Sequence, residues 1–152
     1  MGKARLPIVV FALAVASGWA GADPASDALN KFGLIGTWAH DCNEPASRSN
    51  PYMIFTAPHS GIATRQLRTG ETALDGIMRI EGAHAVNNER LEMSWTQGGI
   101  KLWMVLVMVG KRIRAVESTG SDCRSYIRDG KFTSNNADTL WFSRCGAPDV
   151  VM

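Results

Sequence analysis

The stretch from Gly33 to Cys42, GLIGTWAHDC, carries the pattern that decides the expected fold. A turn-forming glycine and two aliphatic residues lead into a Gly-x-Trp step, after which small and polar residues run up to a cysteine. On a strand, Gly36 and Trp38 point to the same face, and a glycine there lets another chain segment approach closely. The pattern therefore predicts the first strand of a small β-barrel, with the Trp38 indole filling its floor.

Residues 1–22 have the composition of a secretory signal peptide. A short basic start is followed by the apolar run 6–15, and residues 20–22 (AGA) offer a cleavage site of the Ala-x-Ala type. The apolar run is shorter than the roughly 20 residues that a membrane-spanning helix needs. We therefore expect residues 23–152 to form one mature domain, located in the periplasm or secreted, without a transmembrane segment.

The charge of the chain argues against one large class of partner. The sequence has 16 Lys and Arg against 14 Asp and Glu, but Lys3 and Arg5 lie in the predicted signal peptide, so the mature domain is formally neutral. A neutral chain has no general electrostatic attraction for nucleic acid or for an anionic membrane surface. We expect no nucleic-acid partner.

Short β-forming segments recur along the mature domain and are separated by turn residues. The expected strands span residues 33–42, 52–56, 62–69, 74–81, 90–96, 100–109, 113–118, 123–128, 131–133 and 139–145. Before them, residues 23–32 have the spacing of a short helix, with Pro24 at its first position and Gly33 as its stop. The pattern is typical of a closed barrel or a sandwich. We expect an all-β fold: a single antiparallel up-and-down barrel of about eight strands, with the helix capping its open end.

Three cysteines, Cys42, Cys123 and Cys145, lie in the exported part, where one disulfide is expected and one thiol is left over. Trp38 and Trp141 each precede a cysteine by four residues, on the expected first and last strands. Closure of an up-and-down barrel makes those strands neighbours, which favours a Cys42–Cys145 bridge. The pairings Cys123–Cys145 and Cys42–Cys123 remain as alternatives.

The Gly36-Thr37-Trp38 step after a short helix resembles the first signature of the lipocalin/calycin superfamily. More closely, the chain resembles small exported bacterial proteins with a G-T-W-x-x-D-C start, a Pro/Ser-rich loop, a D-G-K turn and a basic residue before the last cysteine. Here the turn is residues 129–131, and the basic residue is Arg144. The resemblance implies a lipocalin-like barrel in which Arg144 lies across the Trp38 indole in a cation–π contact. The second lipocalin signature is not found.

The sequence contains no pattern of catalytic or metal-binding residues. His40 and Cys42 share one face of the expected strand, but two ligands are too few for zinc, and neither His59 nor His84 stands at a ligand spacing from them. Nucleophile-elbow, phosphate-loop, zinc-protease and haem-attachment motifs are all missing. We therefore expect a protein that is not an enzyme and that uses no metal and no cofactor.

The segment 100–109 (IKLWMVLVMV) is the most hydrophobic of the mature domain. One face of the expected strand carries Leu102, Met104, Leu106 and Met108, and the other face is also apolar. A half-solvated strand would be apolar on one face only. One interpretation is core packing on one side and a covering segment on the other. The functional interpretation is a ligand-binding cavity lined by these four residues, with the adaptable methionines shaping it.

These observations give two expectations for function. The first is an exported protein that holds a small apolar or amphipathic molecule non-covalently inside its barrel. The alternative is a protein-binding module, such as an inhibitor of a secreted hydrolase, and a structural role at the cell envelope also stays open. A barrel filled by its own side chains would favour a protein that acts through its surface.

Overall fold

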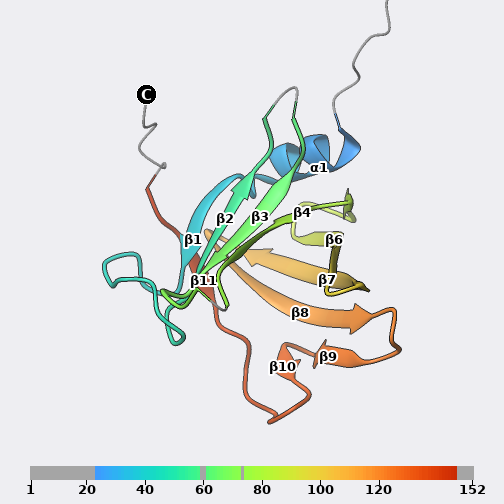
Figure 1. The fold of residues 1–152 in the computed structure, drawn as a ribbon. Coiled ribbons are helices and arrows are strands. Elements are labelled where there is room, and N and C mark those ends of the chain that lie inside the picture. Colours follow the sequence, from blue (N-terminus) through green and yellow to red (C-terminus); the bar gives the residue numbers. More distant parts are fainter. Residues whose placement is uncertain (1–22, 59–60, 73, 147–152) are drawn as a thin grey trace, which may run out of the picture.

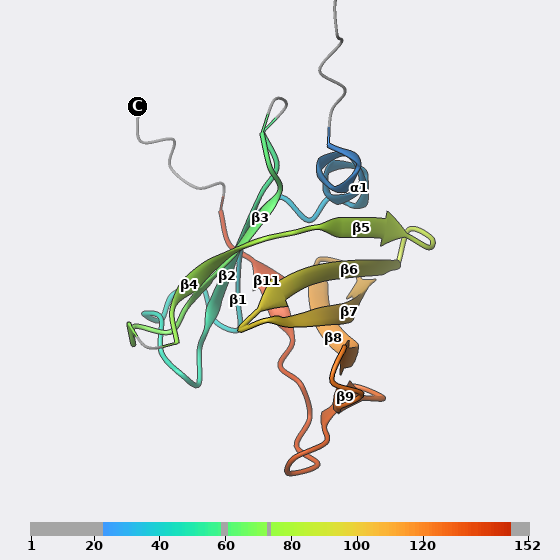
Figure 2. The ribbon, with the colours of Figure 1, turned by 45° about the vertical axis from the view of Figure 1, so that its right-hand side comes forward.

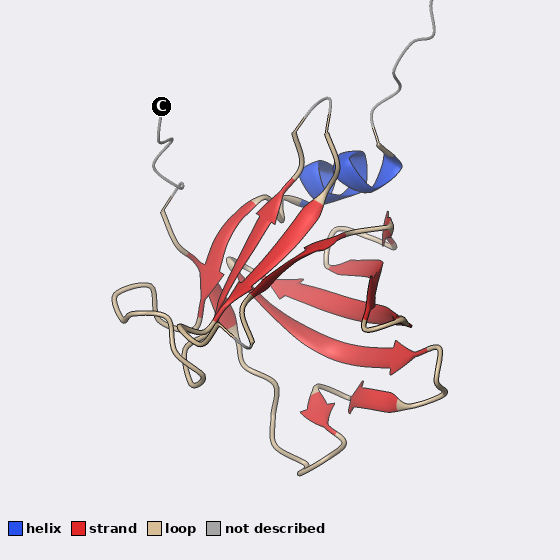
Figure 3. Cartoon of the chain, viewed as in Figure 1, coloured by secondary structure: helices blue, strands red, loops and turns tan. Residues whose placement is uncertain are grey.

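The computed structural model describes residues 23–58, 61–72 and 74–146 of the chain (Figure 1). They form one short helix and one strongly curved antiparallel sheet, and Figure 3 shows how strands dominate the molecule. The predicted signal peptide, residues 1–22, lies outside the described residues.

Helix α1 (Pro24–Phe32) begins and ends where the sequence predicts. The Asp23 carboxylate accepts a hydrogen bond from the backbone N–H two residues on, and Pro24 occupies the first turn, where its missing N–H costs nothing. Gly33 ends the helix in the left-handed conformation, at a φ of 76°. The apolar stripe of α1, which includes the fully buried Leu29, packs into the core at one end of the sheet. The predicted helix is therefore confirmed.

Within the described residues, eleven strands follow the helix. They are β1 (Gly36–Ala39), β2 (Tyr52–Thr56), β3 (Thr64–Arg68), β4 (Gly76–Arg79), β5 (Gly82–Ala85), β6 (Arg90–Gln97), β7 (Ile100–Val109), β8 (Arg112–Gly120), β9 (Ser125–Arg128), β10 (Lys131–Phe132) and β11 (Phe142–Arg144). All pair in antiparallel fashion, as expected. The prediction missed β5, which is four residues long and holds only glycine, alanine and histidine.

The first and last strands lie side by side. Trp38 of β1 stands opposite Arg144 of β11 in the antiparallel register. Just beyond the paired residues, Cys42 and Cys145 form a disulfide with their Cα atoms 5.4 Å apart. The predicted neighbourhood of these strands and the predicted Cys42–Cys145 bridge are therefore confirmed, and Cys123 is left free and exposed.

The barrel is not closed, and this part of the prediction is wrong. The strand order is β4-β3-β2-β1-β11-β8-β7-β6-β5, so β4 and β5 form the two edges of the sheet (Figure 2). The chain does not turn back between them. Ile80 donates its N–H to Ala63 beside β3, and Glu81 donates its N–H to Ser94 on β6, so the chain crosses from one edge to the other. The result is a half-barrel with nine strands on the main path and eleven in all, in place of a closed barrel of about eight.

The hairpin β9–β10 stands off the main path of the sheet. Strand β8 pairs with β11 near its beginning and with β9 near its end, so both partners share one edge of β8. The segment between β10 and β11 is tied to β8 through Thr139, whose hydroxyl donates to the carbonyl of Ala115 at 2.6 Å. This arrangement brings Ile127 of β9 and Phe132 of β10 to the mouth of the curved sheet.

Candidate functional site

The concave side of the half-barrel holds two adjoining cavities. The larger has a volume of about 620 Å³ and the second about 490 Å³. Residues from four different strands and from the loop before β4 line both of them: Arg65, Leu67, Leu74, Met104, Ile127 and Phe132. Because these walls are shared, the two cavities form one interior space.

Strand β7 supplies one wall of this space. Leu102 and Met104 line the larger cavity, and Met104 and Leu106 line the second. Met108 lies in a different pocket, beside Trp38. The structure therefore brings three of the four predicted ligand-binding residues to the same interior and places the fourth at another end of the sheet.

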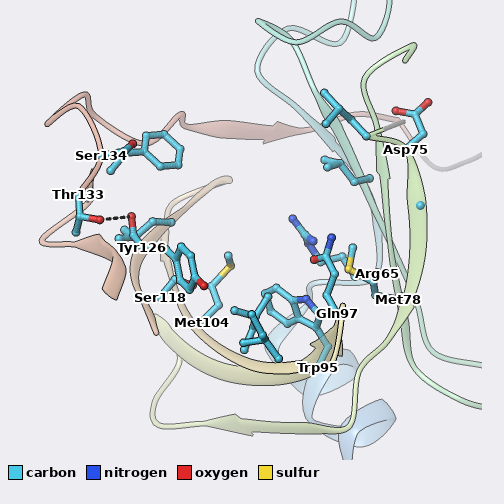
Figure 4. A pocket seen from close by; sticks show the side chains of 17 residues that line it. Arg65, Asp75, Met78, Trp95, Gln97, Met104, Ser118, Tyr126, Thr133 and Ser134 are labelled. Atoms are coloured by element: carbon cyan, nitrogen blue, oxygen red, sulfur yellow. Dashed lines mark hydrogen bonds between the residues drawn. The ribbon is translucent and has the colours of Figure 1, made fainter. Parts of the chain in front are cut away.

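Strands β3 and β4 supply the facing wall. Leu67 and Met78 project from it toward β6 and β7, and Figure 4 shows Met78 across the cavity from Met104. The second cavity runs deeper, toward Met53 and Phe142. The strand alternation explains this wall, because Leu67 stands opposite Met53 in the β2–β3 register and both point inward.

Arg65 carries a charge into this apolar wall. It lies on β3, two residues before Leu67 on the same face, and it lines both cavities. Its Nε atom is buried without a hydrogen-bond partner among the described residues, and none of the ion pairs formed there includes it. Burial lowers the pKa of the Arg65 guanidinium to about 10, so the group is still charged at neutral pH.

Trp95 holds the Arg65 guanidinium in place. The Cζ atom of Arg65 lies 5.1 Å from the centroid of the Trp95 ring, which is a cation–π distance. On another side, an Nη atom of Arg65 lies 3.7 Å from the sulfur of Met53, a weak acceptor. Trp95 itself is only 3% exposed, and its indole N–H also has no partner among the described residues. Two polar donors on side chains that line the larger cavity therefore lack a hydrogen-bond partner among the described residues.

The sequence analysis missed Arg65 and Trp95 as site residues. The signal for Arg65 lies in the segment 64–68 (TRQLR), where the period of a strand puts Arg65 on the same face as the apolar Leu67. A charged residue on the inward face of a strand is unusual, and this alone indicates that Arg65 is a candidate site residue. Whether the Arg65 donors have partners depends on side chains of β6, and β6 is distant from Arg65 in the sequence.

The polar groups at the rim of the larger cavity are occupied by local bonds. The Asp75 carboxylate accepts hydrogen bonds from the backbone N–H and from the hydroxyl of Thr69, and these bonds lower the pKa of Asp75. The Tyr126 hydroxyl donates to Asp122 at 3.0 Å, which raises the pKa of Tyr126. Figure 4 shows Asp75 at the rim, well apart from Arg65. Neither carboxylate therefore neutralises the guanidinium of Arg65, whose side chain is half-buried.

A second cluster, around Trp38, has a structural character. The indole N–H of Trp38 donates to the Leu34 carbonyl at 2.8 Å, and the side chain is 2% exposed. Arg144 crosses it with Cζ 5.8 Å from the ring centroid and donates to the Ile35 carbonyl at 2.6 Å. A Cβ at Gly36 would stand 3.4 Å from the Arg144 side chain, and the Gly36 φ of 131° also favours glycine. Gly36, Trp38 and Arg144 thus form one packed unit.

In the part of the chain that the structure describes, we see no group of side chains assembled into a catalytic or metal-binding site. His40 is exposed, and its Nδ1 lies 3.1 Å from the Trp141 carbonyl, while the neighbouring Cys42 is consumed in the disulfide. Within residues 23–58, 61–72 and 74–146, no three His, Cys, Asp or Glu side chains gather closely enough to hold a metal ion. No helix among these residues has the length and apolar character to cross a membrane.

Comparison of the chain with models of known protein families, with curated proteins and with solved structures finds no match.

Proposed function

We propose that the protein binds a small apolar or amphipathic molecule inside its half-barrel. The observation that carries the proposal is the shared interior between β3–β4 and β6–β7, with an apolar wall on each side. Small-molecule sites are concave, mostly apolar and about 300–1,000 Å³ in volume, with a few convergent polar groups. Each of the two adjoining cavities falls within that range.

The open edge of the sheet supports this proposal, because it offers an entrance. Strand β4 pairs with β3 on one side, and in the described residues no strand is paired with its other side. The larger cavity lies at this gap, since its lining includes Met78 of β4 and Trp95 of β6. A ligand can enter there without breaking a strand pair.

The lining side chains also suit a ligand whose shape is not rigidly specified. Met53, Met78 and Met104 all face the interior. Methionine has three rotatable bonds and a polarisable sulfur, so it adapts to chains of different length and curvature. Burial of an alkyl chain contributes roughly 0.8 kcal/mol per methylene, so a chain of modest length would bind measurably.

Binding of decan-1-ol, an uncharged amphipathic chain, tests the proposal. We expect saturable binding in a calorimetric titration of the mature protein. Leu67→Trp fills the space that both cavities share and should weaken binding at least about 10-fold. The matched control is Ile77→Trp on the neighbouring strand, because Ile77 is 67% exposed and its side chain points away from the cavity lining.

The thermal melting temperature of each variant separates a filled cavity from a misfolded protein. Met104→Phe, a smaller change on the facing wall, serves as the second cavity variant if Leu67→Trp does not fold. Absence of saturable binding to the wild type, or equal binding by the folded cavity variants, would overturn the proposal.

A protein-binding module is the second candidate, and the outer face of the sheet favours it. Trp103 is 44% exposed on β7, with the Lys101 Nζ atom 5.8 Å from its ring centroid. Tryptophan is enriched at protein interfaces and among the residues that contribute most to their binding energy. Trp103→Ser would separate the two functions, because it should leave decan-1-ol binding unchanged and weaken only a protein partner.

A further inference from the structure

We propose that the molecule held in the half-barrel carries a single carboxylate, which binds to the guanidinium of Arg65 and the indole N–H of Trp95. This inference rests on the proposed function and adds to it the chemical class of the ligand's polar end. The ligand would therefore be an amphipathic monocarboxylate, with its apolar chain along the walls of the two cavities.

The first argument is the state of Arg65. A buried charge in a folded protein is normally paired or fully hydrogen-bonded, because removing it from water is costly. The Nε atom of Arg65 is buried and has no partner among the described residues, and the one hydrogen bond that the guanidinium forms there runs from an Nη atom to the sulfur of Met53, a weak acceptor. A guanidinium in this state is a strong site for an oxyanion, since charge-assisted hydrogen bonds are about twice as strong as neutral ones.

The second argument is the position of Trp95. Its ring lies under the guanidinium at 5.1 Å, and its own N–H is buried without a partner among the described residues. In Figure 4, Arg65 and Trp95 line the same side of the larger cavity, with Gln97 beside them. Stacking on the ring limits the rotation of the guanidinium, so less side-chain freedom is lost when an anion binds.

The charges around the cavities point to a monoanion. Among the described residues that line the larger cavity, Arg65 is the only basic one, and the one acidic residue, Asp75, is bound to Thr69 at the rim. The second cavity adds Arg48, but its guanidinium forms a two-pronged ion pair with Glu71 at 2.6 and 2.7 Å. One available positive charge balances one carboxylate, whereas a doubly charged phosphate would keep an unbalanced charge in an apolar site.

The geometry also provides a course for the apolar chain. From Arg65, the shared wall continues along Leu67 and Met104 into the second cavity, which extends to Leu106 and Phe142. These side chains are apolar, and Leu106 and Phe142 belong to the hydrophobic core. A molecule with its carboxylate at Arg65 would therefore place its chain against carbon and sulfur atoms.

The experiment compares decanoate with methyl decanoate, which have the same alkyl chain with and without the charge. Calorimetric titrations at pH 7 should show decanoate binding to the wild type about 10- to 100-fold more tightly than the ester. Arg65→Met keeps an unbranched side chain of similar length and should remove this preference, so that decanoate and the ester bind with about equal affinity. Trp95→Phe keeps the aromatic ring, removes the N–H donor, and should reduce the preference by a smaller factor.

Arg68→Met is the matched control, because Arg68 is an exposed arginine on the same strand and does not line either cavity. It should keep the full preference for decanoate. Decyl phosphate provides a further arm and should bind more weakly than decanoate if the site is built for one charge.

The outcomes separate this inference from the proposed function. Equal binding of decanoate and ester by the wild type, or a preference that survives in Arg65→Met, would overturn the carboxylate assignment and leave the apolar cavity standing. Tighter binding of decyl phosphate than of decanoate would also contradict it. If neither decanoate nor the ester binds, the proposed function fails, and the carboxylate assignment fails with it.

Discussion

Arg65 holds a positive charge between the apolar walls of the half-barrel, and its Nε has no partner among the described residues. Burial lowers the pKa of Arg65 from its ordinary range to about 10, which means that the fold disfavours the charged form. The contact with the Trp95 ring offsets only part of that cost. Under the proposed function, the charge that lowers the stability of the empty protein is the charge that would bind the carboxylate of the ligand.

Replacement of Arg65 by methionine should therefore stabilise the empty protein. We expect Arg65→Met to raise the free energy of unfolding by about 1–3 kcal/mol, because replacing buried charges by apolar groups of similar size is often stabilising by that amount. Urea denaturation at pH 7 in the absence of ligand measures the change. The exposed Arg68→Met should stay within about 0.5 kcal/mol of the wild type. A loss of stability in Arg65→Met would mean that Arg65 is already satisfied in the fold.

The same account predicts how this difference depends on pH. Arg65 has a lower pKa in the folded state, about 10, than in the unfolded state, where the guanidinium is fully hydrated. Between these values the unfolded chain binds the proton and the folded chain does not, so the Arg65 contribution to stability rises with pH. The advantage of Arg65→Met over the wild type should be full below pH 10 and should shrink as the pH rises above 10.

Trp38 and Arg144 form the second residue-scale prediction. Trp38→Ala should cost about 3–5 kcal/mol of unfolding free energy, as for a large buried aromatic, and Arg144→Ala about 1–2 kcal/mol. The double variant should cost less than the two losses added, because the residues are in contact, with Arg144 Cζ 5.8 Å from the ring centroid. Chemical denaturation of the three variants measures this. Strict additivity, or a Trp38→Ala loss below about 1 kcal/mol, would contradict the packed unit.

At the residue scale, the sequence predicted the Trp38–Arg144 contact but missed the unsatisfied state of Arg65. The contact between Trp38 and Arg144 followed from the family resemblance, whose motifs include the first and last strands. The second depends on which side chains lie opposite Arg65, and these come from β2 and β6. The alternation of apolar and polar residues along a strand indicates which face of the sheet a residue lies on. It cannot show whether an acidic side chain of another strand lies opposite that residue.

At the scale of elements, the pairing of β1 with β11 is secured by the Cys42–Cys145 disulfide, across a separation of 103 residues. In the loop-entropy model, a bridge of this span stabilises by about 4–5 kcal/mol. Cys42→Ser and Cys145→Ser should each lose up to that amount, and the double variant should lose no more than either alone. Urea denaturation under non-reducing conditions gives the values.

Cys123→Ser is the control for the disulfide variants, because Cys123 is free and exposed, and its effect should be small. Cys123 has a positive φ of 64°, a conformation that serine tolerates about as well as cysteine. A double variant that loses the sum of the two single losses would show that the cysteines act independently, against a shared bridge.

The bend between β4 and β5 is the element that the sequence did not predict. The sequence predicts one strand over residues 74–81 and a turn near residues 87–88. The turn is close to the observed one, which Val86 and Arg90 close with a backbone hydrogen bond. The change of partner at Ile80 has no local sign. Ile80 is 1% exposed, so its side chain is fixed in the core, while its N–H and that of Glu81 bond to opposite edges of the sheet. Only tertiary packing determines such a crossing.

At the scale of the whole molecule, the open edge gives the half-barrel both an interior and an entrance. The pairing of β1 with β11 and the packing of α1 on the core stabilise one end of the half-barrel. Beside the larger cavity, β4 and β6 are not paired with each other. The predicted apolar wall of β7 lies in this interior, with Leu102, Met104 and Leu106 facing it. Among the described residues, neither a disulfide nor a strand pair therefore links β4 to β6 beside the larger cavity.

Methyl NMR of the methionines tests the central claim most directly, because they mark both the interior and a site outside it. Met53, Met78 and Met104 line the two cavities, whereas Met108 lies beside Trp38 in a separate pocket. In a titration of ¹³C-methyl-methionine-labelled protein with decanoate, we predict saturable shifts at the three interior methyls, with one common affinity, and none at Met108. Shifts at Met108 alone, or no shift at any interior methyl under saturating decanoate, would contradict the claim that the half-barrel is a binding site.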